Sequence, residues 1–212
     1  SGEKVAIIGK NGVGKSTIFN LIQRFILPDT GTIYVNDTDI QTIKLNSYRD
    51  NLCCINQNNH LFDMNIIDNI KLYNNMDYSL LNSALVQSGT QDILHDERNF
   101  FKPVGQDGGM LSGGQKQKII LARLLAKKAS LYLLDEATAN LDYKSEFKIF
   151  HMLHTHFKKN IIIFIIHKQE FLQYMDKIIL LANNGSTIIF NSYLEFKKSN
   201  FNNEHIFDSQ NL

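Results

Sequence analysis

The chain has 212 residues, of which 43% are hydrophobic and 20% charged, and its formal net charge is +1. This composition is typical of a globular protein with a sizeable core, and it excludes a collagen-like or disordered chain. A net charge so close to zero offers no broad basic surface for nucleic acid or anionic lipid, and no apolar run reaches the length of a membrane span.

The first predicted element is a buried strand over residues 2–9, which leads into a glycine-rich stretch and a predicted helix over residues 15–25. The stretch has the G-x-x-x-x-G-K-[ST] spacing of a phosphate-binding loop and comprises Gly9, Lys10, Asn11, Gly12, Val13, Gly14, Lys15, Ser16 and Thr17. Glycines let backbone N–H groups surround an anion, and the helix N-terminus adds its dipole. Lys15 can reach the β- and γ-phosphates of a nucleotide, and the Ser16 hydroxyl can bind Mg²⁺. The alternative is a turn that happens to end in Lys-Ser, but the predicted flanking strand and helix favour the phosphate loop.

Short strands and then helices are predicted over the next hundred residues. The strands lie at residues 32–35 and 52–56, a short helix at 48–50, and further helices at 64–72, 80–86 and 92–94. The second strand contains Cys53 and Cys54, which are adjacent and therefore point to opposite faces, so a bridge between them would be strained. We expect both thiols to be reduced, in a reducing compartment.

The second half of the chain alternates helices with apolar strands. Strands are predicted at residues 130–134, 161–166, 177–181 and 186–190, and helices at 112–127, 143–157 and 193–198, with a poorly ordered polar tail at 199–212. The last two strands flank Asn-Asn-Gly and so predict a hairpin. Alternating strands and helices predict an α/β fold with a mainly parallel sheet covered by helices on both faces.

Two carboxylates follow the apolar strand at 130–134. Asp135 can hold Mg²⁺ through its water shell, and Glu136 can orient and polarise an attacking water. The carboxyl ends of parallel strands share one edge of the sheet, where the phosphate loop also lies. The alternative is a pair of acids that begins a helix, and only the preceding phosphate loop makes the metal interpretation strong.

A third motif comprises Leu111, Ser112, Gly113, Gly114 and Gln115. Ser112 can cap the following helix, and the paired glycines can form an anion-binding nest. A cap alone would explain the serine but not the glycines and the glutamine. With the other two motifs in this order, the chain closely resembles the ATP-binding cassette (ABC) family of ATPases, whose signature is Leu-Ser-Gly-Gly-Gln. The resemblance extends from residue 2 to about residue 196.

The resemblance implies further site residues. Gln57 matches the family's Q-loop glutamine, which senses Mg²⁺ and the attacking water, so it joins Ser16 and Asp135 as a metal-site residue. His167 matches the switch histidine that contacts the γ-phosphate, although a histidine after a strand is by itself a common surface residue. The expected catalytic residues are therefore Glu136, His167 and Gln57. The family's D-loop, which crosses the dimer interface, is matched by Ala139, Asn140, Leu141 and Asp142.

The fold implied by the resemblance is a RecA-like P-loop NTPase core with a mainly parallel sheet, an antiparallel β piece and a helical subdomain insertion. We expect one nucleotide-binding domain over residues 1–212, with the core at about 1–57 and 112–198 and the helical subdomain at about 58–111. The chain begins without Met, directly before its first strand, and the family's adenine-stacking aromatic lies upstream of that strand. We therefore expect a fragment truncated at its N-terminus, and if no upstream segment supplies the stacking aromatic, nucleotide affinity should be reduced.

Two segments resemble the exporter branch of the family. Residues 61–70 are similar to the stretch that docks a transmembrane partner after the Q-loop, and residues 104–108 to the loop ahead of the signature. The chain departs from the branch at a few positions, where Pro103 and Gln106 replace glutamates, Lys116 and Lys118 replace arginines, and Ala139-Asn140 replaces Ser-Ala. None of these departures falls on a phosphate-binding or water-activating position.

The resemblance implies the ATP-binding and ATP-hydrolysing domain of an ABC exporter, with ATP and Mg²⁺ as cofactors. Its expected partners are a second nucleotide-binding domain and a transmembrane domain, fused in the full-length protein, with no nucleic acid. The domain is expected on the cytoplasmic side of a membrane. ATP sites would form head to tail, with the phosphate loop of one copy facing Ser112, Gly113 and Gly114 of the other.

Other functions remain as alternatives. An importer-type cassette is one alternative, because the choice of export over import rests on the single stretch after Gln57. A soluble ABC ATPase of DNA maintenance or translation would need a long coiled-coil insertion or a second cassette, and neither occurs in this sequence. An inactive regulatory cassette would need a damaged phosphate loop or the loss of Glu136. His151 and His154 lie one turn apart in a predicted helix near His156, which raises a metal site as a minor alternative.

Overall fold

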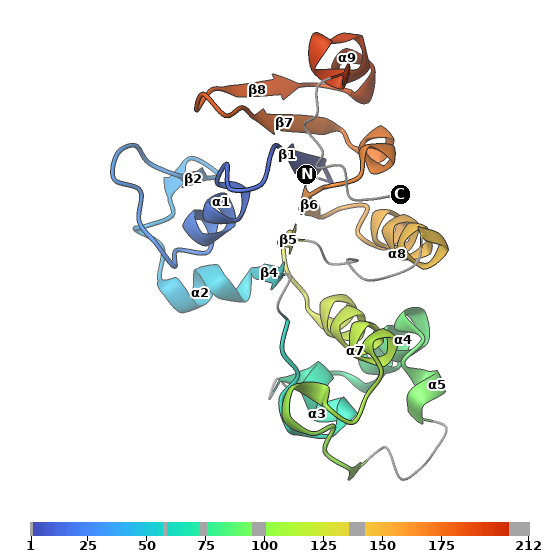
Figure 1. The fold of residues 1–212 in the computed structure, drawn as a ribbon. Coiled ribbons are helices and arrows are strands. Elements are labelled where there is room, and N and C mark those ends of the chain that lie inside the picture. The colour runs from blue at the N-terminus through green and yellow to red at the C-terminus, as the bar shows by residue number, and fades with distance from the viewer. Residues whose placement is uncertain (1, 57–58, 73–75, 95–100, 136–142, 204–212) are drawn as a thin grey trace. The chain divides into compact units, whose positions relative to one another are not determined.

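The computed structural model describes residues 2–56, 59–72, 76–94, 101–135 and 143–203 (Figure 1). The chain forms two compact units. The first comprises Ser1–Cys54, Ala129–Ala137 and Phe150–Leu212, and the second comprises Ile55–Lys128 and Thr138–Ile149.

A six-stranded sheet forms the centre of the first unit, with the strand order β4-β5-β6-β1-β7-β8. The strands are β1 (Lys4–Ile8), β4 (Leu52–Ile55), β5 (Leu131–Asp135), β6 (Ile161–Ile165), β7 (Lys177–Leu181) and β8 (Thr187–Phe190). Strand β6 pairs in parallel with β5 and β1, and β1 with β7, whereas β7 and β8 form the predicted antiparallel hairpin. The predicted mainly parallel sheet is confirmed. Every residue of β1 is buried, as expected for a strand covered on both faces.

Helices cover both faces of this sheet, because successive side chains of its apolar strands point to opposite faces and both faces must be buried. The helices and ribbon strands of the first unit are α1 (Lys15–Ile22), β2 (Tyr34–Val35), β3 (Thr38–Asp39), α2 (Leu45–Asp50), η2 (Gln169–Tyr174), α9 (Tyr193–Lys198) and η3 (Asn200–Asn203), and α8 (Tyr143–His156) runs from the second unit into the first. Phe19 of α1 packs in one cluster with Ile7, Leu133 and Ile165. The neighbouring position, Tyr132, points to the other face, where its ring lies 4.2 Å from that of Phe157 at the end of α8.

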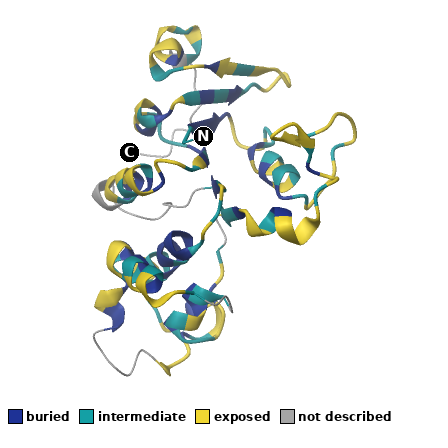
Figure 2. Ribbon diagram, turned by 180° about the vertical axis from the view of Figure 1, so that it is seen from behind, coloured by how far each residue is buried: buried dark blue, intermediate teal, exposed yellow. Residues whose placement is uncertain are grey.

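The described elements of the second unit are helices. It contains α3 (Ile66–Lys71), α4 (Tyr78–Ser88), α5 (Gln91–Leu94), η1 (Gln106–Gly108) and α7 (Gly113–Ala126). Helix α7 packs against α3 and α4, and its apolar residues include the fully buried Ile119 and Ala122 (Figure 2). The sequence expectation placed this helix with the core. The structure differs because the apolar surface of α7 is buried within the helical unit.

Local differences from the predicted elements have identifiable causes. Helix α1 ends at residue 22 and not 25, because Arg24 adopts a left-handed conformation with φ +57°. The predicted strand at 32–35 shortens to β2 and pairs with β3, which was missed. The predicted disorder of the tail is wrong for its first residues, since η3 is formed and the ring of Phe201 lies 6.5 Å from that of Phe190. Residues 204–212 lie outside the described residues.

Candidate functional site

The phosphate loop, residues 9–17, leaves β1 at a position where only glycine fits. Gly9 has φ +149°, and a Cβ built there would lie 2.6 Å from the carbonyl oxygen of Leu181. At the other end of the loop, Gly14 is the N-cap of α1 in a left-handed conformation, with no side-chain cap. The first N–H groups of a helix have no intrahelical partners, so the start of α1 can receive an anion.

Lys15 folds back over the phosphate loop. Its ammonium donates hydrogen bonds to the carbonyl oxygens of Gly9 at 2.7 Å and Lys10 at 2.9 Å, and the side chain is buried. Two acceptors within the loop therefore hold this cation where the glycines turn the backbone. The positive charge is positioned before any phosphate arrives.

Ser16 and Asp135 come together although they are far apart in the sequence. The Ser16 hydroxyl, in the first turn of α1, donates a 2.8 Å hydrogen bond to Oδ2 of Asp135 at the end of β5. A hydroxyl and a carboxylate are hard oxygen donors of the kind that Mg²⁺ prefers when it also binds phosphate oxygens. The donor set therefore fits the metal that the sequence implies.

The sheet register places the expected site residues at one edge. Ile165 of β6 pairs with both Ile7 of β1 and Asp135 of β5, so the three strands end at the same level. The N–H of Ile166 donates to the carbonyl of Ile7 at 3.2 Å, and the half-buried His167 follows it. His167 and Asp135 thus emerge at the edge where β1 enters the phosphate loop.

Several expected site residues lie outside the described residues. They are Gln57, Glu136, Ala139, Asn140, Leu141 and Asp142. Their proposed roles therefore remain predictions from the sequence.

Cys54 lies near this edge of the sheet, in surroundings that favour the protonated thiol. Burial, with further contributions from Cys53 and Asp135, raises the pKa of its thiol to about 12. Both cysteines are free thiols, as predicted. The histidines of α8 also gain no metal site, since the described residues contain no group of three or more His, Cys, Asp or Glu side chains that could hold a metal ion.

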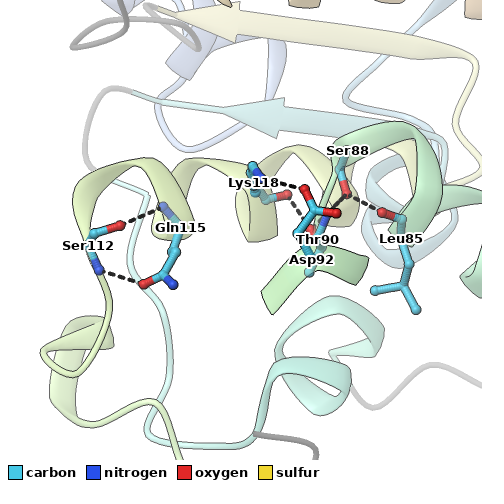
Figure 3. Close-up of polar contacts among 7 residues, drawn as sticks. All are labelled: Leu85, Ser88, Thr90, Asp92, Ser112, Gln115 and Lys118. Carbon is cyan, nitrogen blue, oxygen red and sulfur yellow. Dashed lines mark hydrogen bonds and ion pairs between the residues drawn. The ribbon is translucent and has the colours of Figure 1, made fainter. Parts of the chain in front are cut away.

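The signature segment, residues 111–115, begins helix α7 (Figure 3). The Ser112 hydroxyl accepts a hydrogen bond from the N–H of Gln115 at 3.3 Å, and the Gln115 side chain accepts one from the N–H of Ser112 at 2.9 Å. This reciprocal capping box confirms the predicted cap and accounts for the glutamine, which we had expected to need another explanation. Gly113 and Gly114 are exposed, and a Cβ at either position would meet no atom of the described residues within 4 Å.

A polar cluster ties α7 to the end of α4 (Figure 3). The Thr90 hydroxyl donates to the carbonyl of Lys118 at 3.0 Å and lies 2.7 Å from the Ser88 hydroxyl, and both hydroxyl residues are buried. The Lys118 ammonium lies 3.1 Å from a carboxylate oxygen of Asp92. This ion pair is exposed and contributes little, so Lys118 acts here mainly through its backbone and stem.

Asn69 and Arg123 hold α7 on the segment before α3, and sequence analysis missed them. Asn69 is fully buried, and its amide group donates to the carbonyls of Phe62, Met64 and Asn65. Arg123 of α7 donates from Nη2 to Oδ1 of Asn69 at 3.0 Å and from Nε to its carbonyl at 2.9 Å. A polar residue in the apolar pattern of α3 was the only signal, and it does not identify its partner.

His60 and Asp107 form a second link in this unit. His60 Nδ1 lies 3.0 Å from an oxygen of Asp107, which also accepts a hydrogen bond from the N–H of Leu61 at 3.3 Å. The hydrogen bond from His60 lowers the pKa of Asp107 below its ordinary value. The link joins the segment at 60–61 to the loop that precedes the signature segment.

Comparison with known families shows which protein family the chain belongs to. The model of the ABC transporter family matches residues 1–139, which include the phosphate loop, the signature segment and Asp135. The chain belongs to the ABC transporter family. The sheet, the antiparallel pair and the helical unit are those of the ABC ATPase fold.

Several curated proteins are similar to this ABC chain. The ATP-dependent lipid A-core flippase of Bordetella avium (strain 197N) is 34% identical over 183 residues, which cover 85% of this chain and 31% of that protein. The alpha-hemolysin translocation ATP-binding protein HlyB of Escherichia coli is 36% identical over 182 residues, covering 85% and 26%. The beta-(1-->2)glucan export ATP-binding/permease protein NdvA of Agrobacterium fabrum (strain C58 / ATCC 33970) is 37% identical over 151 residues, covering 70% and 26%.

A solved structure gives the same assignment. The structure of a bacterial Atm1-family ABC exporter with ATP bound superposes with a TM-score of 0.84 at 30% sequence identity, and the match covers 93% of this chain and 35% of that one. The chain thus spans about a third or less of the proteins it resembles. Within the described part of the chain, no helix is long and apolar enough to cross a membrane.

Proposed function

We propose that this domain binds and hydrolyses ATP with Mg²⁺ and so powers transport by an ABC exporter. In the complete transporter it lies on the cytoplasmic side of a membrane, coupled to a transmembrane domain. It works head to tail with a second nucleotide-binding domain, which is either a second copy or a related chain. The transported substrate is recognised by the transmembrane domain.

The hydrogen bond between Ser16 and Asp135 beside the phosphate loop carries this proposal. Lys15 and the first turn of α1 would bind the β- and γ-phosphates, since they combine a held cation with N–H donors that the helix does not use. Ser16, Asp135 and Gln57 would hold Mg²⁺, which supplies Lewis-acid stabilisation of phosphate charge when bound. Glu136 would orient the attacking water and His167 would contact the γ-phosphate.

The signature segment supports a composite site. Glycine in a helix costs about 0.5–1 kcal/mol relative to alanine, so a helix that starts with two glycines needs a reason. Among the described residues, no atom approaches Gly113 or Gly114 closely enough to exclude a Cβ. An ATP phosphate held by a second domain would supply the reason, because the helix N-terminus offers N–H groups and a positive dipole. Charge on the γ-phosphate would then be neutralised from both sides, so ATP joins the two domains and hydrolysis separates them.

Export is supported by the relatives and by the sequence after Gln57. The similar proteins reported above are named as a flippase, a translocation protein, an export protein and an exporter. Residues 61–70, which resemble the exporter docking stretch, are fixed to α7 through Asn69 and Arg123. A movement imposed on this segment by a transmembrane partner would therefore reach the helix that carries the signature segment.

The substitution Glu136→Gln tests the proposal. The variant should bind ATP with near-normal affinity and form a stable dimer in ATP and Mg²⁺, whereas its hydrolysis should fall by about 10²–10⁴-fold, as expected for the loss of a general base. Phosphate release and light scattering of the 212-residue chain measure the two effects. Exposed Glu170→Gln is the matched control. Hydrolysis at the parent rate by the Glu136 variant would refute the assigned role.

A further inference from the structure

The C-terminal end of the phosphate-binding helix α1 is bonded by side chains that the site description does not use. Helix α1 has eight residues, so at about 1.5 Å per residue its two ends lie only about 10 Å apart. Its first turn carries Lys15 and Ser16, and the backbone leaves its last turn through the left-handed Arg24. A rigid attachment at one end of so short a helix fixes the other end.

Backbone N–H groups donate hydrogen bonds to only some of the carbonyl groups at the C-terminal end of α1. The N–H of Phe25 donates to the carbonyl of Asn20 at 2.9 Å, and the N–H of Arg24 donates to that of Leu21 at 3.0 Å. These two bonds form a Schellman motif, with Arg24 at the position that glycine usually takes. They leave the next three carbonyls, at residues 22–24, for other donors.

Tyr48 and Arg49 of α2 supply those donors. The Tyr48 hydroxyl donates to the carbonyl of Ile22 at 2.7 Å. Arg49 donates from Nε to the carbonyl of Gln23 at 3.1 Å and from Nη2 to the carbonyl of Arg24 at 3.0 Å. The planar guanidinium spans two successive carbonyls, and its charge suits the negative end of the helix dipole.

Two further contacts interlock the same residues. The Arg49 guanidinium lies over the ring of Phe25, 4.8 Å from its centroid, and the Arg24 guanidinium lies 5.9 Å from the centroid of the Tyr48 ring. Arg24 also donates to the carbonyl of Ile43 at 2.7 Å, just ahead of α2. Burial raises the pKa of the Tyr48 hydroxyl, with Arg24 opposing, so this hydroxyl stays protonated and remains a donor.

We propose that Tyr48 and Arg49 are positioning residues of the ATP site, which set the orientation of α1 and thereby the placement of Lys15 and Ser16 on the nucleotide phosphates. The proposal rests on the proposed function and adds residues to it. Within the described residues, none of the hydrogen bonds or cation–π contacts of Tyr48 and Arg49 reaches a residue of the phosphate loop. Tyr48 and Arg49 act by fixing the far end of the helix that bears Lys15 and Ser16.

Nucleotide affinity and hydrogen exchange together test the proposal in the 212-residue chain. Loss of one hydrogen bond should raise the Kd for MgATP about five-fold in Tyr48→Phe, and loss of the guanidinium fork about ten-fold in Arg49→Lys, with a larger rise in Arg49→Gln, which also loses the charge. Displacement of a fluorescent ATP analogue measures Kd at a temperature where circular dichroism shows each variant to be folded. Tyr34→Phe, on an exposed ring in the same unit, is the matched control and should leave Kd unchanged.

Amide exchange without nucleotide separates this proposal from the proposed function. In Arg49→Lys and Tyr48→Phe, exchange should accelerate along all of α1, including its first turn at Lys15, while α7 serves as an unchanged reference. Two outcomes would overturn the proposal: faster exchange confined to the last turn of α1, or lower stability with Kd unchanged. Either would mean that Tyr48 and Arg49 only cap the end of the helix. Failure of the unmodified chain to bind ATP would instead overturn the proposed function, and exchange in the first turn would still decide whether the attachment controls α1.

Discussion

Glycines occupy the functional turns of both units, but the chain needs them for different reasons. At Gly9 the chain itself demands glycine, because a Cβ would lie 2.6 Å from the Leu181 carbonyl. At Gly113 and Gly114 none of the residues that the structure describes demands it. The phosphate loop is also bonded within its own unit, through Lys15 and the Ser16–Asp135 hydrogen bond. The signature segment has its capping box, but its two glycines are exposed. Under the proposed function, the phosphate loop is a half-site that its own unit completes, and the signature segment is a half-site that acts on the ATP of a second domain.

The largest effect should follow from removing the cation of the complete half-site. Lys15→Met keeps most of the buried stem but loses the ammonium, so ATP hydrolysis should fall by at least about 100-fold. Phosphate release at saturating MgATP measures this loss. The exposed Lys44→Met is the control and should retain near-parent activity. Substantial hydrolysis by the Lys15 variant would mean that the ATP site lies elsewhere.

Substitutions of glycine should separate the two half-sites. Gly9→Ala should destabilise the fold by about 2–4 kcal/mol, through a backbone clash and a left-handed conformation. Gly114→Ala should instead stabilise α7 slightly, by up to about 1 kcal/mol, while ATP-dependent dimerisation and hydrolysis fall at least about ten-fold. Urea unfolding and light scattering measure the two quantities. Equal losses of stability in both variants would remove the distinction between the half-sites.

A smaller effect should distinguish the half-buried His154 of the first unit from the exposed His60–Asp107 pair of the second. Burial lowers the pKa of His154, Lys4 adds to this effect and Asp176 opposes it. Because its folded pKa lies below its unfolded value, the unfolded state binds more protons in this range, and stability should fall as the pH drops through about 6.5. The effect should stay below about 1 kcal/mol, since the side chain is partly exposed.

Urea midpoints between about pH 5 and pH 8 check this prediction. His154→Gln should flatten the pH dependence. Asp107→Asn is the comparison variant in the second unit and should change it little, because both partners of the His60–Asp107 pair are exposed. If the Asp107 variant lost its pH dependence of stability and the His154 variant kept it, the pH dependence would have to be assigned to the His60–Asp107 pair and not to His154.

The sequence predicted those parts of the fold whose signals are local. Helix α7 starts where Ser112 was expected to cap it, and the β7–β8 hairpin forms across Asn-Asn-Gly, because a cap and a tight turn depend on adjacent residues. Strand β3 was missed, since two residues with a Thr-Asp sequence carry no strand signal. The early end of α1 was also missed, because a left-handed arginine at a helix end does not have the usual glycine as a marker.

The candidate site likewise combines motifs that the sequence predicted with supporting residues that it did not. The phosphate loop was predicted from its spacing, the carboxylate at the end of β5 from its place after an apolar strand in a chain with a phosphate loop, and the signature segment from the resemblance to the ABC family. The residues that hold them were not, because Arg49 bonds carbonyls about 25 residues away and Arg123 bonds a partner 54 residues away. Such contacts depend on the tertiary fold, and an isolated arginine in a helix does not reveal what it binds.

The most direct test of a shared ATP site mixes two inactive variants. Lys15→Met lacks a working phosphate loop and Gly114→Ala lacks a working signature segment, so each should hydrolyse ATP poorly alone. In a mixed head-to-tail dimer, the intact phosphate loop of the Gly114 variant meets the intact signature segment of the Lys15 variant. Equal mixing should therefore restore about a quarter of the parent activity, because half of the dimers are mixed and one of their two sites is intact. No recovery at any ratio, with both variants folded, would contradict a site shared between two domains.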